Sequence, residues 1–329
     1  MTPEFQDLPR SWKKRYPFRT GTTSFIYPAG YTENVARLGP YVDEIEILMF
    51  ESGAGSRPTE ALVRDLASMG KDYAITYNIH LPIDLVLTHP DKSHRRKACR
   101  ILQQFITILM PLDPTVYVLH LSPPDTIQDN KDLSAWQNIA ADTLREILLT
   151  GLSGRQLAIE NLFYPYAWLD LLIEAYDLGV CLDTGHLALQ SGDIEAFLGQ
   201  YGPRIANGHL HGLRNGQDHS ALTGLPDNYK VPLINWLRGF TGSVSLEVFA
   251  VQPLLESLTC LDRMMARPDR SAAPNKFTNN SDTQSQPANG NKRAQNELLV
   301  GMSTAGGISF QHFLTPYTAT NDANNAAAP

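Results

Sequence analysis

An acidic residue and a histidine, separated by two small residues, follow a short apolar run in this chain. The run Val180 to Leu182 leads directly into Asp183, Thr184, Gly185 and His186. A tight turn with this spacing lets the carboxylate and the imidazole converge on one point. α/β folds place their chemistry just past the ends of such buried strands. The alternative is an ordinary strand-to-helix turn in which Asp183 caps the next helix.

Other strand-like runs of the chain also end in a histidine or an acidic residue. These ends carry Glu51, His80, His120, Glu160, His209, His211 and Glu247. A hydrogen bond to the backbone or an ordinary ion pair explains any single one of them. The whole set favours a divalent cation, because carboxylates that converge in one pore repel one another unless a cation neutralises them. Mixed histidine and carboxylate ligands suit zinc, manganese or iron better than magnesium or calcium.

Two alternating periodicities predict the elements that position these residues. The expected strands are 18–25, 42–50, 73–80, 116–121, 156–161, 179–182, 205–210 and 243–249. The expected helices are 31–38, 58–69, 93–110, 133–149, 166–176, 194–201, 232–240 and 252–265. Pro58 and Pro232 suit the first turn of a helix, and Ser93 and Asp193 are expected N-caps. Strands and helices in this order predict a (β/α)8 TIM barrel, in which all strand ends meet at one rim.

The composition divides the chain into three segments. Residues 1–17 are expected to form an N-terminal extension and residues 18–266 a metal-dependent barrel. Hydrophobic residues make up 43% of the whole chain, which suffices for a large core. From 267 to 329 the chain is crowded with Asn, Ser, Thr, Gln, Ala, Gly and Pro. Such a segment buries too little apolar surface to offset its loss of entropy on ordering, so we expect a disordered C-terminal tail.

The net charge indicates which kind of partner the protein binds, and the cysteines indicate its cellular compartment. With 27 basic and 34 acidic residues, the formal net charge of −7 argues against a general affinity for nucleic acid or anionic membrane. A small-molecule substrate is expected instead. The three cysteines are widely spaced and form no CxxC pattern, which is typical of reduced core residues. No run reaches the length of a membrane span and the N-terminus has no leader pattern, so we expect a cytoplasmic protein.

Four motifs resemble the metal ligands of the xylose-isomerase-like barrel superfamily, which includes sugar epimerases and type IV apurinic endonucleases. They are Glu160 in AIENL, Asp183 in CLDTGH, His209 in NGHLHG and Glu247 in SLEVF, and the resemblance spans residues 18–265. It implies a divalent metal, zinc or manganese. In the epimerases one metal lies between two glutamates that act as acid and base on either face of a sugar carbon.

The endonuclease branch adds further ligands and holds more metal, which implies two or three ions here. Counterparts in this chain are His80 in IHLP, His120 in LHLSPP, His186 after strand six, and the pair Asp218 and His219 in GQDHSAL. The pair is adjacent in this sequence, whereas the family separates its two members by one residue. This departure leaves open whether both side chains reach a metal.

A finer resemblance concerns the N-terminal pattern KRYPFRTGTTSFIYPAGYTENVARLGPYVDEIEILMFES, together with HLP, HLHG and DHSAL. It is similar to the cobamide-remodelling phosphodiesterases, a branch that opens the nucleotide loop of vitamin B12-type cofactors. The resemblance implies a metal-dependent hydrolase that acts on a cobamide, with Glu160, Glu247 and His186 as catalytic residues. A corrinoid is large and not polyanionic, so it needs no basic groove. The side chains expected to contact it are Thr22, Tyr27, Phe163, Tyr164, Trp168 and His211, although ordinary loop packing is the alternative for the aromatic ones.

Two other functions remain open at the level of the sequence. One is a metal-dependent sugar isomerase or epimerase in which Glu160 and Glu247 form the acid-base pair. The other, from a different class, is a barrel that binds a cofactor or sugar without turning it over. A binding protein gains little from so many buried titratable groups. The additional histidines favour the hydrolase over the epimerase.

Overall fold

The computed structural model describes residues 7–124 and 126–266, and within these residues the chain forms a closed barrel of parallel strands. The strand order around the barrel is β1-β10-β7-β6-β5-β4-β3-β2. The strands are β1 (Arg19–Thr23), β2 (Glu44–Leu48), β3 (Thr76–His80), β4 (Tyr117–Leu119), β5 (Leu157–Glu160), β6 (Gly179–Asp183), β7 (Ile205–Leu210) and β10 (Ser243–Leu246). The predicted (β/α)8 TIM barrel is confirmed. The tail expected to be disordered, 267–329, lies outside the described residues.

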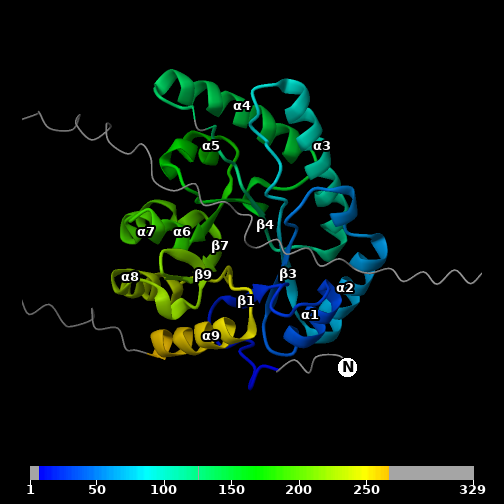
Figure 1. Cartoon of the computed structure of the whole chain (residues 1–329), viewed down its shortest axis with the longest axis vertical. Coiled ribbons are helices and arrows are strands. Elements are labelled where there is room, and N and C mark those ends of the chain that lie inside the picture. The colour runs from blue at the N-terminus through cyan, green and yellow to red at the C-terminus, as the bar shows by residue number, and fades with distance from the viewer. Residues whose placement is uncertain (1–6, 125, 267–329) are drawn as a thin grey trace, which may run out of the picture. The chain divides into compact units, whose positions relative to one another are not determined.

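Helices surround the strands, as Figure 1 shows. They are α1 (Tyr31–Leu38), α2 (Glu60–Tyr73), α3 (Lys92–Leu109), α4 (Asn130–Leu148), α5 (Asp170–Ala175), α6 (Thr184–Leu189), α7 (Ile194–Tyr201), α8 (Asp227–Leu237) and α9 (Val251–Ala266). Short 3₁₀ turns lie at Ala54–Ser56, Met110–Leu112, Gly154–Gln156, Tyr166–Leu169, Gly202–Arg204 and Leu222–Gly224. Within the described chain, no helix combines the length and the apolar character needed to cross a membrane.

The main core lies between the outer faces of the strands and the inner faces of the helices. In α3, for example, Leu102, Phe105, Ile106 and Leu109 are buried at the spacing of one helix face. Outward-facing strand residues such as Ile159 meet these helices in the same core cluster. This two-layer packing holds the strands in register, and so fixes the positions of the side chains at the strand ends.

The residues before β1 close the barrel against its last helix. Trp12 is only 2% exposed, and its Nε1 donates a hydrogen bond to Asp262 of α9 at 3.1 Å. Arg10, Arg15 and Tyr16 also bond to the Asp262 carboxylate. The largely buried carboxylate of Asp262 therefore joins the start of the described chain to its end.

Four local expectations from the sequence are wrong. Pro58 lies outside α2, because it precedes the N-cap Thr59. Pro232 lies inside α8, because that helix already begins at Asp227 behind Pro226, another residue that suits a helix start. Asp91, not Ser93, caps α3, and its carboxylate accepts the backbone N–H of Ser93 at 2.7 Å. Tyr73 ends α2 instead of beginning β3, since Ala74 adopts a left-handed φ of 50° and reverses the chain there.

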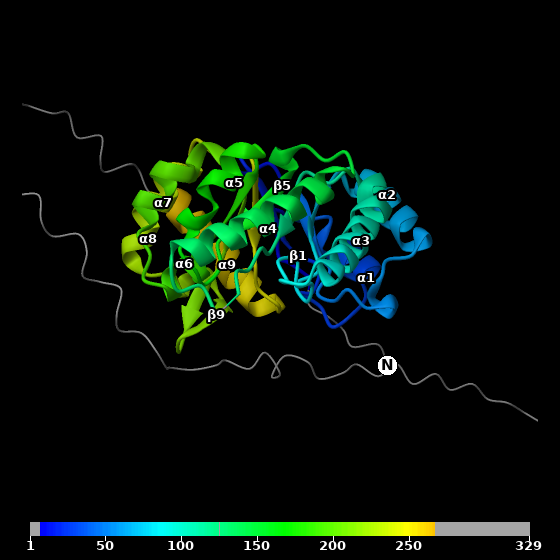
Figure 2. The ribbon, with the colours of Figure 1, turned by 90° about the horizontal axis from the view of Figure 1, so that it is seen from above.

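A hairpin after β7 is absent from the predicted alternation of elements. Its antiparallel strands are β8 (Gly212–Arg214) and β9 (Gln217–Ser220). Asn215 and Gly216 form the turn with φ values of 55° and 76°, the left-handed conformation that an Asn-Gly hairpin turn requires. Figure 2 shows β9 at one edge of the barrel, near α6. The hairpin brings β9 back to the carboxyl ends of the barrel strands.

Candidate metal centre

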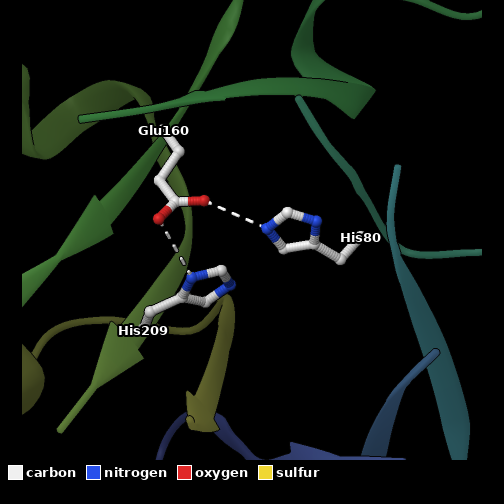
Figure 3. A group of neighbouring side chains, drawn as sticks. All are labelled: His80, Glu160 and His209. Carbon is white, nitrogen blue, oxygen red and sulfur yellow. Dashed lines mark hydrogen bonds and ion pairs between the residues drawn. The ribbon is translucent and has the colours of Figure 1, made fainter. Parts of the chain in front are cut away.

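Glu160 lies at the middle of the clustered side chains, at the carboxyl end of β5. Its Oε2 lies 2.9 Å from His120 Nε2 and 3.2 Å from His80 Nε2. Its Oε1 lies 3.1 Å from His186 Nδ1 and 3.7 Å from His209 Nδ1. Figure 3 shows the two oxygens of this carboxylate facing His80 on one side and His209 on the other. One buried acid thus links ligand candidates from β3, the end of β4, β7 and α6.

Asp183, at the end of β6, has two roles at once. Its Oδ1 accepts a hydrogen bond from the backbone N–H of His186 at 2.6 Å and so caps α6. Its Oδ2 lies 3.8 Å from His209 Nδ1, toward the cluster. The helix cap and the ligand position, which the sequence presents as alternatives, therefore coexist in one carboxylate.

Glu247 completes a group of four residues at the strand ends. Its Oε2 lies 3.0 Å from His209 Nδ1. Glu160, Asp183, His209 and Glu247 each offer one ligand atom, and these atoms lie within 4.8 Å of one another. The structure thus brings together the four ligands that the family resemblance implies.

The hairpin adds two more ligand candidates to this cluster. Asp218 Oδ2 lies 3.5 Å from His186 Nε2, and His219 Nε2 lies 3.5 Å from Glu247 Oε1. Adjacent residues of a regular strand point to opposite faces, but His219 has a left-handed φ of 51°, which interrupts that alternation. Both members of the adjacent pair therefore face the centre.

Further groups of ligand atoms surround the four-residue set. Each of them gathers its atoms within 4.8 Å: His80 with Glu160 and His209, His186 with Asp218 and His219, and His211 with His219 and Glu247. Among the described residues, the clustered side chains thus supply more ligand atoms than a single cation needs.

The buried acids and imidazoles shift one another's pKa values. Burial disfavours the charged imidazolium, yet Asp183, Asp218 and Glu160 together raise the pKa of His186 to about 12. Burial likewise disfavours the Glu160 carboxylate, but His120 and His209 outweigh it and hold the pKa of Glu160 well below its usual value. Burial is the largest cause at His120, where it lowers the pKa. The carboxylates of the cluster thus stabilise a positive charge next to them. A divalent cation would supply such a charge.

Unpaired atoms in the cluster test whether a metal fits. His209 Nδ1 and Glu247 Oε2 are buried and lack a hydrogen-bond partner, although they lie 3.0 Å apart. Buried polar groups rarely stay unpaired, because each one costs free energy on folding. A cation between these two atoms would satisfy both, and the mixed nitrogen and oxygen donors suit zinc or manganese. The residues present therefore fit a divalent metal.

His211 is placed differently from its expected role in substrate contact. It is fully buried; its Nε2 donates to Asp183 Oδ2 at 2.9 Å, and its Nδ1 accepts the backbone N–H of His219 at 2.9 Å. Both ring nitrogens are therefore used within the protein. Gly185 makes room for this ring, because a Cβ atom there would lie 2.0 Å from His211 Cε1. His211 therefore supports Asp183 and the hairpin through these hydrogen bonds.

Four other residues expected to contact substrate are engaged in packing. The hydroxyl of Thr22 donates to the Leu246 carbonyl at 2.9 Å, and that of Tyr164 donates to the Leu121 carbonyl at 2.7 Å. Trp168 stacks on Tyr164 with 6.1 Å between ring centroids, and Tyr27 is buried. For these aromatic residues the structure supports the alternative of ordinary loop packing.

Phe163 is exposed next to the centre, and its contact with substrate stays a prediction. Its side chain is 57% exposed, and its ring lies 4.9 Å from that of His186. Phe249, which follows β10, lies 5.2 Å from the ring of His219 and 6.2 Å from that of Phe50. Aromatic rings therefore lie against two of the histidines of the centre, His186 and His219.

The sequence places the wrong glutamate of the second strand at the centre. Glu51 is exposed beyond the end of β2, where it accepts a hydrogen bond from Ser56. Glu46, inside β2, is instead fully buried with its Oε1 2.9 Å from His209 Nε2. The alternation EIEIL shows that the glutamates of β2 share one face. That signal could have identified Glu46 as a residue of the barrel interior.

Comparisons with known proteins agree with this fold. A family model described as "Xylose isomerase-like TIM barrel" matches residues 33–264. Among curated proteins, no sequence matches the chain.

Several solved structures have the same fold. A D-tagatose 3-epimerase-like protein is 18% identical with a TM-score of 0.62, and the match covers 75% of this chain and 97% of that one. D-psicose 3-epimerase from Clostridium cellulolyticum H10 is 17% identical with a TM-score of 0.59, over 75% and 98% of the two chains. The IOLI protein, with a bound zinc atom, is 13% identical with a TM-score of 0.58, over 75% and 98%.

Proposed function

The chain belongs to the xylose isomerase-like TIM barrel family, and from this membership we propose that it is a divalent metal-dependent enzyme acting on a small molecule. The reaction that we propose is the hydrolysis of a phosphodiester. Sugar epimerisation is the second candidate. The two reactions place different demands on the residues around the four-residue set.

The observation that carries the hydrolase proposal is the number of additional ligand candidates. A one-metal epimerase is complete with Glu160, Asp183, His209 and Glu247. Four residues around this set belong to further groups that could hold an ion: His80, His186, Asp218 and His219. His120 lies 2.9 Å from Glu160 Oε2 and adds one more imidazole beside them. Two or more bound cations stabilise the attacking and leaving oxygens of a displacement at phosphorus.

The chain's own residues have distinct roles in this proposal. Glu160 presents one oxygen to His80 and His120 and the other to His186, so it can serve two ion positions. Asp218 and His219, which belong to the hairpin, lie next to His186 and Glu247. Phe163 and Phe249 flank the opening and limit the access of bulk water to the reacting ester.

For the substrate we propose a cobamide whose nucleotide loop is opened at its phosphodiester. The N-terminal sequence pattern supports this choice, since it resembles that of the cobamide-remodelling phosphodiesterases. A corrinoid is not polyanionic, which agrees with a net charge of −7. Exposed apolar side chains also follow β2, β3 and β5, and they could contact a large ring system: Phe50, Ile83, Val86 and Phe163.

The fold similarities favour the second candidate, because the solved structures include 3-epimerases. In that reaction Glu160 and Glu247 would act as the acid-base pair on a sugar carbon. Both carboxylates belong to the same group of ligand atoms, as such a pair requires. The epimerase mechanism gives His80, His120 and the hairpin pair no part in metal binding or acid-base catalysis.

One experiment separates the two candidates. The full-length protein, loaded with zinc or manganese, is incubated with a cobamide in one arm and with ketohexoses in deuterated water in the other. The hydrolase proposal predicts a corrinoid product that lacks the lower-ligand nucleoside, and no deuterium at the carbon next to the sugar carbonyl. Deuterium exchange together with an intact cobamide would establish the epimerase instead.

A further inference from the structure

Glu46, a residue of the barrel interior, contacts the metal centre from beneath. We propose that it is a positioning residue, which holds the His209 imidazole so that Nδ1 faces the metal. The inference rests on the metal centre of the proposed function but not on the choice of substrate. Glu46 lies on β2 and His209 on β7, so the contact crosses the barrel interior between two strands that are separated by β1 and β10.

The geometry assigns a separate partner to each nitrogen of His209. Nε2 lies 2.9 Å from Glu46 Oε1. Nδ1 lies 3.0 Å from Glu247 Oε2 and 3.7 Å from Glu160 Oε1. The ring thus stands between one carboxylate beneath it and the ligand group above it.

The chemistry of these groups fixes the tautomer of a neutral His209. Glu46 Oε1 accepts the hydrogen bond at 2.9 Å, so the proton of the imidazole lies on Nε2. Nδ1 then keeps its lone pair, which is the form of imidazole that binds a cation. The opposite tautomer would place the Nε2 lone pair against a carboxylate at 2.9 Å. Carboxylates in this position also make the histidine a stronger ligand.

The surroundings of Glu46 indicate that it does not serve stability alone. Its Oε2 is buried without a hydrogen-bond partner. Within the described chain, its ion pairs include only His209 and no lysine or arginine. A buried carboxylate with so few partners costs free energy of folding. Such a local cost is typical of a residue kept for the geometry of a site.

Glu44 provides a contrast on the same strand and the same face. It is equally buried, but its two oxygens accept hydrogen bonds from Thr76, Thr115 and Asn78, and Arg19 lies at ion-pair distance. Its carboxylate is thus compensated, and none of these four partners is a ligand candidate. Glu44 is therefore a matched control for Glu46.

The test compares Glu46→Gln with Glu44→Gln in the full-length protein. Zinc dissociation constants are measured by competition with a chromophoric chelator, in the absence of substrate. We expect Glu46→Gln to raise the dissociation constant about 10- to 100-fold, because the amide keeps the shape but loses the charge. Glu44→Gln should lower the melting temperature but leave the zinc dissociation constant within about threefold of the wild type. Equal dissociation constants for the two variants would overturn the role of Glu46.

A second measurement needs no variant, and so remains decisive if Glu46→Gln does not fold. Long-range ¹H–¹⁵N correlation spectra of the zinc-loaded wild type report which ring nitrogen of His209 carries the proton. We expect the proton on Nε2 and the metal on Nδ1. A proton on Nδ1 would contradict the inference. A wild-type protein that binds no zinc would overturn the metal centre itself, and with it the proposed function.

Discussion

Asp218 and His219 are neighbours in β9, yet both side chains face the same centre, Asp218 toward His186 and His219 toward Glu247, each at 3.5 Å. The left-handed backbone of His219 makes this possible. The hairpin therefore adds two ligand candidates that the barrel strands do not supply. This relationship distinguishes the centre from a metal site that consists only of the four residues at the strand ends.

Removing one hairpin ligand should remove an ion without emptying the centre. Asp218→Asn keeps the shape of the side chain but loses the charge opposite His186, so we expect about one divalent ion less per chain while the ion at Glu160, Asp183, His209 and Glu247 remains. Elemental analysis of the dialysed protein measures this. Gln217→Ala, at the exposed neighbouring position, should keep the full metal content. Equal metal content in both variants would exclude a metal role for Asp218.

His120→Ala tests the other side of the centre. His120 Nε2 lies 2.9 Å from Glu160 Oε2. If the imidazole is a metal ligand, its loss should lower both metal content and phosphodiester cleavage, the latter by more than about 100-fold. The control is the exposed His94 of α3, which pairs with the N-cap residue Asp91. His94→Ala should leave metal content and phosphodiester cleavage unchanged. If His120→Ala kept its full metal content, His120 would not be a metal ligand and would serve only as a hydrogen-bond partner of Glu160.

Gly185→Ala should damage the centre through His211. The added Cβ would lie 2.0 Å from His211 Cε1, so the ring must move away from Asp183. We expect a loss of about 1–3 kcal/mol in the free energy of unfolding, together with weaker zinc binding. Gly199 in α7 is the control, because nothing lies within 4 Å of an added Cβ there. Gly199→Ala should stabilise the protein by about 0.5–1 kcal/mol, and a Gly185→Ala variant of wild-type stability would contradict the packing.

The network at Asp262 predicts a pH dependence of stability. Burial alone would raise the pKa of Asp262, but hydrogen bonds from Tyr16, Arg15 and Trp12 outweigh it and lower the pKa below its usual value. A carboxyl group whose pKa is lower in the folded state stabilises the fold above its unfolded pKa, about 3.9, and loses that contribution as the pH falls through the folded value. Urea unfolding of wild type and Asp262→Asn should therefore differ at about pH 7 and converge in acid. A difference between the two proteins that does not shrink as the pH falls below the unfolded pKa would contradict the assignment.

The sequence is sufficient to predict the barrel because long helices and buried strands carry strong periodicities. The resemblance to the barrel superfamily adds the four-residue set Glu160, Asp183, His209 and Glu247, which the positions of the strand ends alone do not single out. The hairpin is harder to predict, because strands of three and four residues have no measurable period. Its one local signal is the pair Asn215 and Gly216, whose turn type is specific.

Glu46 shows a different limit of sequence reasoning. Alternation in β2 reveals that its glutamates share a face, but the location of the strand end decides which acid reaches the centre. The strand ends at Leu48, so the later acid, Glu51, is already outside. The side-chain contacts of Thr22, Tyr164 and His211 also depend on residues distant in sequence, which no local pattern encodes.

The most direct test of the central claim is a count of the bound ions. Native mass spectrometry of the full-length protein, titrated with zinc, reports how many ions each chain retains. The additional ligand groups around Glu160 predict two or three ions per chain. Saturation at a single ion would contradict the multi-metal hydrolase and leave the one-metal epimerase as the better account.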